Sequence, residues 1–448
     1  MKKSDKPLFS KPVLAGLMIF ISLMVLVLNI TAPPSNYPPV QIEYWQTENQ
    51  IPITWINQAS WQGSNKLELR IRFSHGRQQD QKLGLTDALF ALLMLDTLPL
   101  STSPINQRLA DVTTKLSYHV NDQESELAIT LNSEASYLDA SMETLIPWFN
   151  EPQFKPRTFL KWQQSHTPYY LSYKAQLEQA LLPQVKLPLD GVLDEYSLSL
   201  QDIKQHYRLL LNSIDQITLV GDLTDTSRIQ AHLAKLTKNT QYIASQPSPY
   251  IADKISLQTQ TGPELSQSHG AVAFNAFASA KDWISLQIWL PYYLSQLKQA
   301  SNPSYVQLHL ESSPQIQWAW WSIHHQQSLL QKTADTQLSK YKQDDYFSKQ
   351  VLSKAIKSLS EEKFELALTR YQEKLIHLVQ SPSWWARMAS QETKSDQIMV
   401  EQAKTGLNLK QWNESYAHAI QDLSYDDFND SIKRLVITSS LQELQERQ

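Results

Sequence analysis

The chain has 448 residues, which is enough for two or more domains with hydrophobic cores of their own. Hydrophobic residues make up 42% and aromatic residues 10%, a composition that indicates a folded protein and excludes a largely disordered one. The formal net charge is only -4, so nucleic-acid binding is not expected, and the absence of cysteine excludes disulfides, thiol nucleophiles and cysteine-ligated metals.

An uncharged apolar segment occupies residues 13–30, after an N-terminus of residues 1–12 that contains Lys2, Lys3, Lys6 and Lys11. As a helix this segment would rise about 27 Å, which nearly spans a bilayer core. The positive-inside rule then predicts a cytoplasmic N-terminus, a single-pass anchor in a bacterial inner membrane and a periplasmic remainder. A signal peptide cleaved near Ala32 is the competing interpretation, but the long apolar run and the lack of a clear A-x-A sequence favour the anchor.

The segments that follow have alternating strand-like and helix-like patterns. Residues 31–44 contain four prolines and predict a stiff spacer. A first strand led by a turn at residues 48–50 is expected over residues 47–57, and a second strand has one apolar face formed by Leu67, Leu69, Ile71 and Phe73. After a polar turn at residues 75–82, the sequence GLTDALFALLMLDT at residues 84–97 predicts an amphipathic helix with a buried stripe of Leu85, Leu89, Leu92 and Leu93.

The pattern continues with a helix over residues 105–116, strands over 117–121 and 124–131, a helix over 136–149 and a corner at 151–154. Ser199 and Asp202 then have the spacing of a helix-capping pair, and the buried strand ITLVGDL follows at residues 217–223.

The second half of the sequence has a similar plan. Residues 245–270 are rich in Ser, Gln, Thr and Pro and predict a linker. Beyond it, Ser360 opens a long helix, and Ser424 with Asp427 repeats the capping pattern of Ser199. The repeat predicts two similar halves, residues 45–244 and 271–448.

These motifs resemble the M16 (insulinase-like, mitochondrial-processing-peptidase-like) metallopeptidases over roughly residues 40–440. The resemblance rests on the strand, turn and helix of residues 67–97 and on the capped helix followed by a strand that ends in Gly-Asp. It implies an α+β fold with two similar half-domains, each a mixed or antiparallel sheet packed by helices, here placed after an N-terminal transmembrane helix.

The same resemblance implies that the zinc site is degenerate. Family members carry H-x-x-E-H on this helix, with two His ligands and a Glu that activates water; the aligned positions here are Asp87, Phe90 and Ala91. The third ligand, a Glu in the family, aligns with Gln164 or the adjacent Gln163. The sequence therefore predicts no metal site and no cofactor, and no stoichiometric zinc in the exported part of the chain.

The second half of an active member supplies an Arg and a Tyr that hold the substrate and stabilise the oxyanion. The aligned positions are Glu311 and Trp318. The adjacent His324 and His325 would point to opposite faces of a strand, and the other histidines have no metal-binding spacing, so we interpret them as solvated or hydrogen-bonded. The Trp-rich run at residues 318–321 has two open interpretations, core packing or a partner interface.

Three functions remain compatible with the sequence. The first is a catalytically inactive partner or regulatory subunit of an active M16 zinc peptidase. The second is a stand-alone module that binds extended peptides or unfolded protein by strand addition. The third is an active peptidase with a rearranged site, which is disfavoured because no ligand set can be assembled.

Overall fold

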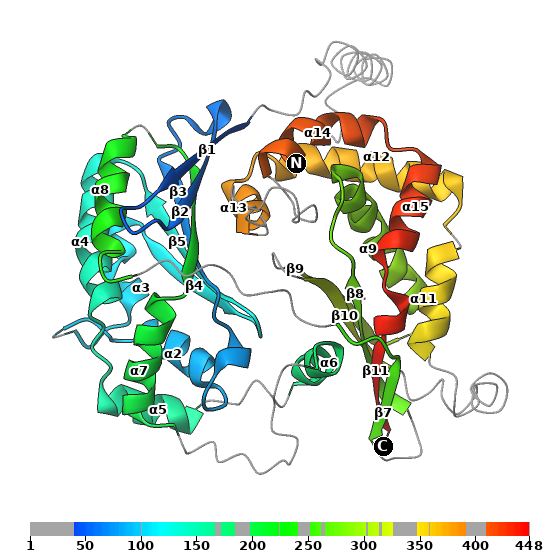
Figure 1. The fold of residues 1–448 in the computed structure, drawn as a ribbon, viewed down its shortest axis with the longest axis horizontal. Coiled ribbons are helices and arrows are strands. Elements are labelled where there is room, and N and C mark those ends of the chain that lie inside the picture. The colour runs from blue at the N-terminus through cyan, green and yellow to red at the C-terminus, as the bar shows by residue number, and fades with distance from the viewer. Residues whose placement is uncertain are drawn as a thin grey trace, which may run out of the picture. The chain divides into compact units, whose positions relative to one another are not determined.

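The computed structural model describes residues 40–99, 101–165, 172–183, 198–223, 225–240, 251–260, 265–301, 303–312, 316–325, 347–357, 359–390 and 409–447. The predicted anchor at residues 13–30 and the first part of the spacer lie outside these ranges. Within them, no helix combines the length and the apolar character needed to span a bilayer. The described residues form a mixed α/β structure with two sheets packed by helices (Figure 1).

The first sheet has the strand order β1-β2-β6-β3-β5-β4. All of its pairings are antiparallel except that of β2 with β6. The strands are β1 (Val40–Gln46), β2 (Pro52–Gln58), β3 (Lys66–Phe73), β4 (Lys115–Val120), β5 (Ser125–Asn132) and β6 (Ile214–Gly221). The helices of this part of the chain are α2 (Leu85–Leu93), α3 (Ile105–Arg108), α4 (Ala135–Asn150), α5 (Pro156–Ser165), α6 (Tyr173–Leu181), α7 (Leu200–Leu211) and α8 (Thr226–Leu236), with 3₁₀ turns η1 (Ala59–Trp61), η2 (Arg77–Gln79) and η3 (Ala110–Val112).

The second sheet has the strand order β7-β11-β8-β10-β9. Its strands are β7 (Ser256–Gln260), β8 (Leu265–Phe274), β9 (Tyr305–Ser312), β10 (Gln317–His324) and β11 (Gln442–Arg447). The helices are α9 (Ala280–Ser301), α11 (Phe347–Lys357), α12 (Glu361–Leu378), α13 (Pro382–Ser390), α14 (Leu409–Gln421) and α15 (Tyr425–Leu435), and the 3₁₀ turn η7 is Thr438–Ser440.

The two sheets share one connectivity. Apart from the extra edge strand β1, the strand orders β2-β6-β3-β5-β4 and β7-β11-β8-β10-β9 correspond. In each, the last strand in sequence pairs in parallel with one neighbour and antiparallel with the other: β6 with β2 and β3, and β11 with β7 and β8. The capped helices that precede these last strands also correspond. Ser199 and Ser424 each accept a hydrogen bond from the backbone three residues on, at 3.2 and 3.1 Å, in full capping boxes with Asp202 and Asp427. The predicted similarity of the two halves is therefore visible in topology.

Each sheet also receives a helix from the other part of the chain. Helix α6 packs on β8 and β11, and α13 packs on β3 and β6 (Figure 1). The α13 contact is fixed by hydrogen bonds, since Trp61 Nε1 donates to the Gln380 carbonyl at 2.7 Å and Arg72 Nη1 donates to the Ser390 carbonyl at 2.6 Å. These two bonds join the second half of the chain to the part of the chain that forms the first sheet.

The Trp-rich strand is part of the core. Trp318 and Trp321 of β10 are 3% and 0% exposed, and Trp320 is partly buried. Trp318 packs with the α6 residues Leu177 and Leu181, whereas Trp321 forms an edge-to-face contact with Tyr293 of α9. Core packing, one of the two open interpretations, is the one that the structure favours.

Three segments differ from the sequence expectations. A strand that was not predicted, β1, begins at Val40 inside the predicted spacer, whereas the turn and strand predicted over residues 47–57 are present as a turn followed by β2. The helix expected over residues 105–116 is only α3 and a 3₁₀ turn, because Thr113 adopts a left-handed φ of 53° that ends it. The second sheet begins at Ser256, within the predicted linker, because β7 pairs with the distant β11.

We expect the contact of α6 with the second sheet to make stability depend on pH. His269 of β8 stacks on Tyr173 at a ring-centroid distance of 3.8 Å, and neither of its buried ring nitrogens has a hydrogen-bond partner. Burial, together with His324 and His325, lowers the pKa of His269 to about 4. Its stabilising contribution is therefore complete above pH 6.5 and is lost as the pH falls toward 4, with a slope of at most about 1.4 kcal/mol per pH unit.

The substitution His269→Phe keeps an aromatic ring at this position and removes the ionisable group. Urea unfolding at pH 7 and pH 5 should show a smaller loss of stability in the variant than in the parent chain. Equal losses in the two proteins would contradict this assignment.

Candidate functional site

The candidate site is built around Asp87, in the first turn of α2. The helix starts after Gly84, whose φ of 76° makes the sharp turn that glycine tolerates best. Arg77 in η2 faces Asp87 and donates two hydrogen bonds to its carboxylate, from Nε at 2.6 Å and from Nη2 at 2.8 Å. The two side chains are only 8% and 15% exposed. The carboxylate is thus held by a bidentate, charge-assisted pair.

The other two positions on α2 offer no ligand atom. Phe90 is fully buried, lies edge-to-face with Phe73 at 5.8 Å and stacks with Tyr118 at 5.5 Å. Ala91 is partly buried. Of the three α2 positions aligned with the zinc motif, only Asp87 has a polar side chain, and that side chain is bound to a guanidinium.

Gln164 is exposed near the end of α5. Another carboxylate, Glu178 of α6, is 2% exposed, and the charges of Asp122, Lys174, Arg77 and Glu311 act on it. One of its oxygens and one oxygen of the buried Asp122 have no hydrogen-bond partner. Burial and the neighbouring Asp122 carboxyl raise the pKa of Glu178 well above its ordinary value, and burial raises the pKa of Asp122 to about 6 against the opposing charge of Arg77.

Glu311 and Trp318, the positions aligned with the Arg and Tyr of active members, lie close to Lys174 of α6. Trp318 and Glu311 are cross-strand partners in β10 and β9. Lys174 of α6 pairs with Glu311 at 2.8 Å and lies 5.9 Å from the centre of the Trp318 ring, and Trp320 donates a hydrogen bond to Glu311 at 3.0 Å. Although burial alone would raise it, these partners hold the pKa of Glu311 below its ordinary value.

Arg77 and Lys174 thus supply the positive charge at this site. Arg77 contacts Asp87 and, at 3.5 Å, Asp122, while Lys174 contacts Glu311 and acts electrostatically on Glu178. Such a site can position a polar chain, but at the aligned positions it has neither two imidazoles nor a free general base. Sequence reasoning missed Arg77, Asp122, Lys174 and Glu178; the only local signal was an acid at 178 within the apolar face of α6.

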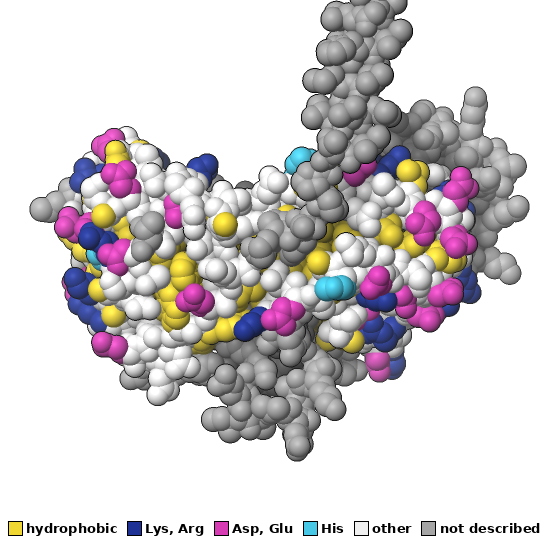
Figure 2. Space-filling view, turned by 90° about the horizontal axis from the view of Figure 1, so that it is seen from above, with side chains coloured by type: hydrophobic (Ala, Val, Ile, Leu, Met, Phe, Trp, Pro, Cys, Tyr) yellow, Lys and Arg dark blue, Asp and Glu magenta, His cyan; other side chains and the backbone are white. Residues whose placement is uncertain are grey.

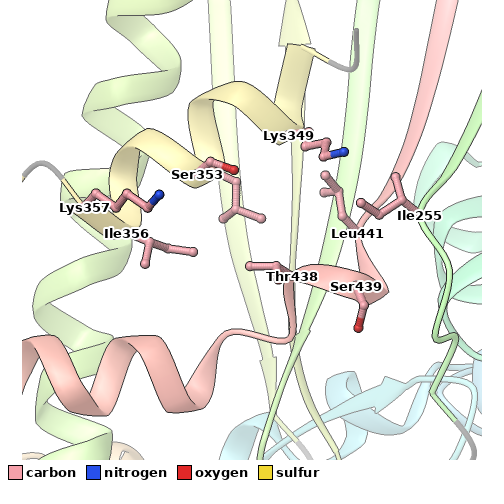
Figure 3. A pocket seen from close by; sticks show the side chains of 9 residues that line it. Ile255, Lys349, Ser353, Ile356, Lys357, Thr438, Ser439 and Leu441 are labelled. Carbon is pink, nitrogen blue, oxygen red and sulfur yellow. The ribbon is translucent and has the colours of Figure 1, made fainter. Parts of the chain in front are cut away.

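A cavity of about 470 Å³ lies elsewhere, between α11 and the segment that leads into β11 (Figure 3). Its lining combines apolar side chains such as Leu352 and Leu441 with Lys349, Ser353 and Lys357, all three of which are exposed. This open hollow contains no cluster of catalytic or metal-binding groups, and we assign it no role in the candidate site.

The molecular surface agrees with the low net charge. On the face shown in Figure 2, acidic and basic side chains of the described residues are interspersed, and no broad basic patch covers the elements seen there. This distribution gives no support to nucleic-acid binding, which concentrates Lys and Arg on one face.

Solved structures with the same fold are numerous, although no family model matches the chain and no curated protein is significantly similar in sequence. A protease from Helicobacter pylori has a TM-score of 0.64 at 15% identity, with 92% of this chain and 100% of that chain covered. A peptidase M16 inactive domain from Pseudomonas fluorescens has a TM-score of 0.65 at 12% identity, covering 91% of this chain and 98% of that chain.

A third structure is the ferredoxin protease FusC in complex with Arabidopsis ferredoxin, with a TM-score of 0.60 at 10% identity. The match covers 91% of this chain and 46% of FusC, so this chain spans about half the length of that protease. The chain therefore has the M16-like peptidase fold, as its sequence motifs predict.

Proposed function

We propose that this chain is a catalytically inactive member of the M16 peptidase family, anchored in the bacterial inner membrane through residues 13–30, with its main part in the periplasm. In this proposal it acts as the partner or regulatory subunit of an active M16 zinc peptidase. The main observation in favour of a loss of catalysis is the bidentate pair of Arg77 with Asp87. The structural similarity to the peptidase M16 inactive domain from Pseudomonas fluorescens supports the proposed loss of catalysis.

The physical reason is electrostatic. A catalytic zinc needs three protein ligands and an open position for water. At the aligned positions, a permanently charged guanidinium already satisfies Asp87, while Phe90 is in the core and Gln164 is exposed. A dication bound at Asp87 would have to displace or repel Arg77.

The proposal includes binding of an extended peptide or unfolded protein. Strand β4 pairs only with β5 among the described strands. On its outer edge the Asn106 side chain of α3 bonds both backbone groups of Leu116, at 3.0 and 2.7 Å, so strand addition is proposed along the part of this edge that contains Tyr118. The exposed Tyr118 stacks on Phe90, and partial burial together with the charge of Asp87 raises the pKa of its hydroxyl against the opposing charge of Arg77, which places this edge beside the candidate site. FusC in complex with ferredoxin supports protein binding on this fold.

Site-specific crosslinking tests the proposal. A photo-reactive amino acid at Tyr118 of β4 is compared with the same residue at Tyr44 of β1, which is 50% exposed on the opposite edge of the same sheet. In detergent-solubilised membranes, the chain should copurify with an M16 peptidase that carries H-x-x-E-H. Extended polypeptide should crosslink at Tyr118 and not at Tyr44.

Deletion of the chain should lower the activity of the associated peptidase. If the chain purifies alone and deletion leaves that activity unchanged, while crosslinking at Tyr118 persists, the stand-alone binding module replaces the partner-subunit proposal. Equal crosslinking at both positions would contradict binding along β4.

A further inference from the structure

Two histidines and an aspartate that are distant in sequence meet beside α2. His75 follows β3, Asp80 follows η2, and His206 lies in the middle of α7. One ligand atom of each lies within 4.8 Å of the others. The cluster adjoins the Asp87–Arg77 pair, since the Asp80 N–H donates to the Arg77 carbonyl at 3.1 Å, but it uses none of the positions aligned with the zinc motif. From the sequence, both histidines are expected to be solvated or hydrogen-bonded, so a metal here departs from the expectation of no metal.

The separation of these atoms suits a small coordination sphere. His206 Nε2 lies 3.4 Å from Asp80 Oδ1, and the His75 and His206 rings meet edge-to-face with centroids 4.7 Å apart. Two ligands on a tetrahedral zinc ion with bonds of about 2.0–2.1 Å are about 3.3 Å apart. The His206–Asp80 separation therefore already matches one edge of such a site.

The hydrogen bonding of His75 and Asp80 is also suited to metal binding. His75 Nε2 is buried and has no hydrogen-bond partner, which is unusual for a polar atom in a protein interior. The Asp80 carboxylate is buried and is held by the Thr86 backbone N–H, 3.2 Å from each oxygen, and by the Thr86 hydroxyl at 2.5 Å. Hydrogen bonds of this kind orient the carboxylates that bind metals.

The charges favour a cation. The side chains of His206 and Asp80 are only 1% and 2% exposed, so the Asp80 carboxylate lies in the interior beside an imidazole. A divalent ion would offset the cost of burying this carboxylate, because buried charges need a partner.

We propose that His75, Asp80 and His206 bind one borderline divalent metal ion, with zinc as the best fit to two imidazoles and a carboxylate. The ion would fasten the turn between β3 and α2 to α7, and it would have a structural role. Lys82 and Asp202, paired at 2.7 Å, already join the same two segments.

The alternative is a hydrogen-bonded chain without metal. Thr86 Oγ1 donates to Asp80 and lies 2.8 Å from His206 Nε2, so a protonated Nε2 could donate to the hydroxyl. In this hydrogen-bonded arrangement His75 Nε2 has no partner, whereas in the metal site His75 Nε2 would be a ligand. The two arrangements make different predictions for zinc addition.

The test is metal titration of the full chain after treatment with chelator. Zn²⁺ should bind with a stoichiometry of one per chain and raise the melting temperature, and Co²⁺ should give the absorption bands of a low-coordinate site. His75→Gln and Asp80→Asn should each weaken Zn²⁺ binding by at least about a hundredfold, more than loss of an outer hydrogen bond does. Circular dichroism verifies that both variants fold.

His232→Gln is the matched control, because His232 also pairs with one aspartate, Asp139 at 2.8 Å, but lies on α8 away from the cluster. It should bind Zn²⁺ like the parent chain. Absence of stoichiometric binding to the folded parent, or binding that His75→Gln and Asp80→Asn leave unchanged, would overturn the proposal. Binding without any proteolysis leaves the proposed function intact, so failures of the two proposals are distinguishable.

Discussion

Replacing Arg72 by Ala is expected to lower the free energy of unfolding by about 3–5 kcal/mol, because it leaves a buried carboxylate without its partner. Arg72 of β3 forms two hydrogen bonds to Asp215, at 2.9 and 3.1 Å, and both side chains are about 95% buried. The substitution also removes the bond to the Ser390 carbonyl at the end of α13. Urea unfolding monitored by tryptophan fluorescence measures the loss.

Two further variants separate the causes of this loss. Arg72→Met combined with Asp215→Leu removes both charges and should recover most of the stability, because apolar replacements of buried ion pairs are often neutral. Arg228→Ala, which breaks exposed pairs with Asp139 and Asp225, should cost only a small fraction as much. Equal losses for Arg72→Ala and Arg228→Ala would contradict the account of the buried pair.

Gly221→Ala is expected to cost about 3 kcal/mol, because backbone strain and a steric clash add at one position. Gly221 ends β6 with a φ of +128°, which L side chains rarely adopt. A Cβ there would lie 2.3 Å from the Lys66 carbonyl oxygen, which belongs to the backbone of β3 and cannot rotate away. Thermal unfolding of the variant measures the effect.

Gly63→Ala is the control for strain alone. Gly63 also has a positive φ, of +78°, but a Cβ there would meet nothing within 4 Å. The cost should therefore be only about 1–2 kcal/mol, the penalty of the left-handed conformation. A Gly221→Ala variant no less stable than Gly63→Ala would show that the close approach of β6 to β3 is not a constraint.

Local patterns predicted the elements whose partners are close in sequence or whose signal is periodic. The predicted face of Leu67, Leu69, Ile71 and Phe73 is buried in β3, and the predicted stripe of α2 is buried in full. The capping pairs at Ser199 and Ser424 are confirmed by hydrogen bonds, because a cap is complete within four residues. At Ser360 the helix begins as predicted, but the side chain forms no capping bond.

What sequence reasoning missed depends on long-range contacts. Strand β7 is polar and lies in a segment with loop-like composition, and it exists because it pairs with the C-terminal β11. Likewise, Glu178 of α6 is near Asp122 only because the helix packs across to the second sheet. The meeting of His75 with His206 has the same cause, since neither residue has a ligand neighbour at a recognisable spacing.

At the positions aligned with the zinc motif, the sequence shows the residue types but not their contacts. The structure adds what surrounds them: Arg77 at Asp87, the aromatic contacts of Phe90, and Lys174 at Glu311. No local pattern predicted that basic side chains of η2 and α6 would neutralise these acids, because the pairing depends on how η2, α2 and α6 come together.

A proteolysis assay tests whether this M16-like fold has lost peptidase chemistry. The purified full chain is incubated with an unfolded protein, with added Zn²⁺ and with chelator, beside an H-x-x-E-H peptidase as positive control. We expect no cleavage by this chain under any of these conditions, even if zinc binds at His75 and His206. Cleavage that chelator abolishes and zinc restores would contradict this expectation.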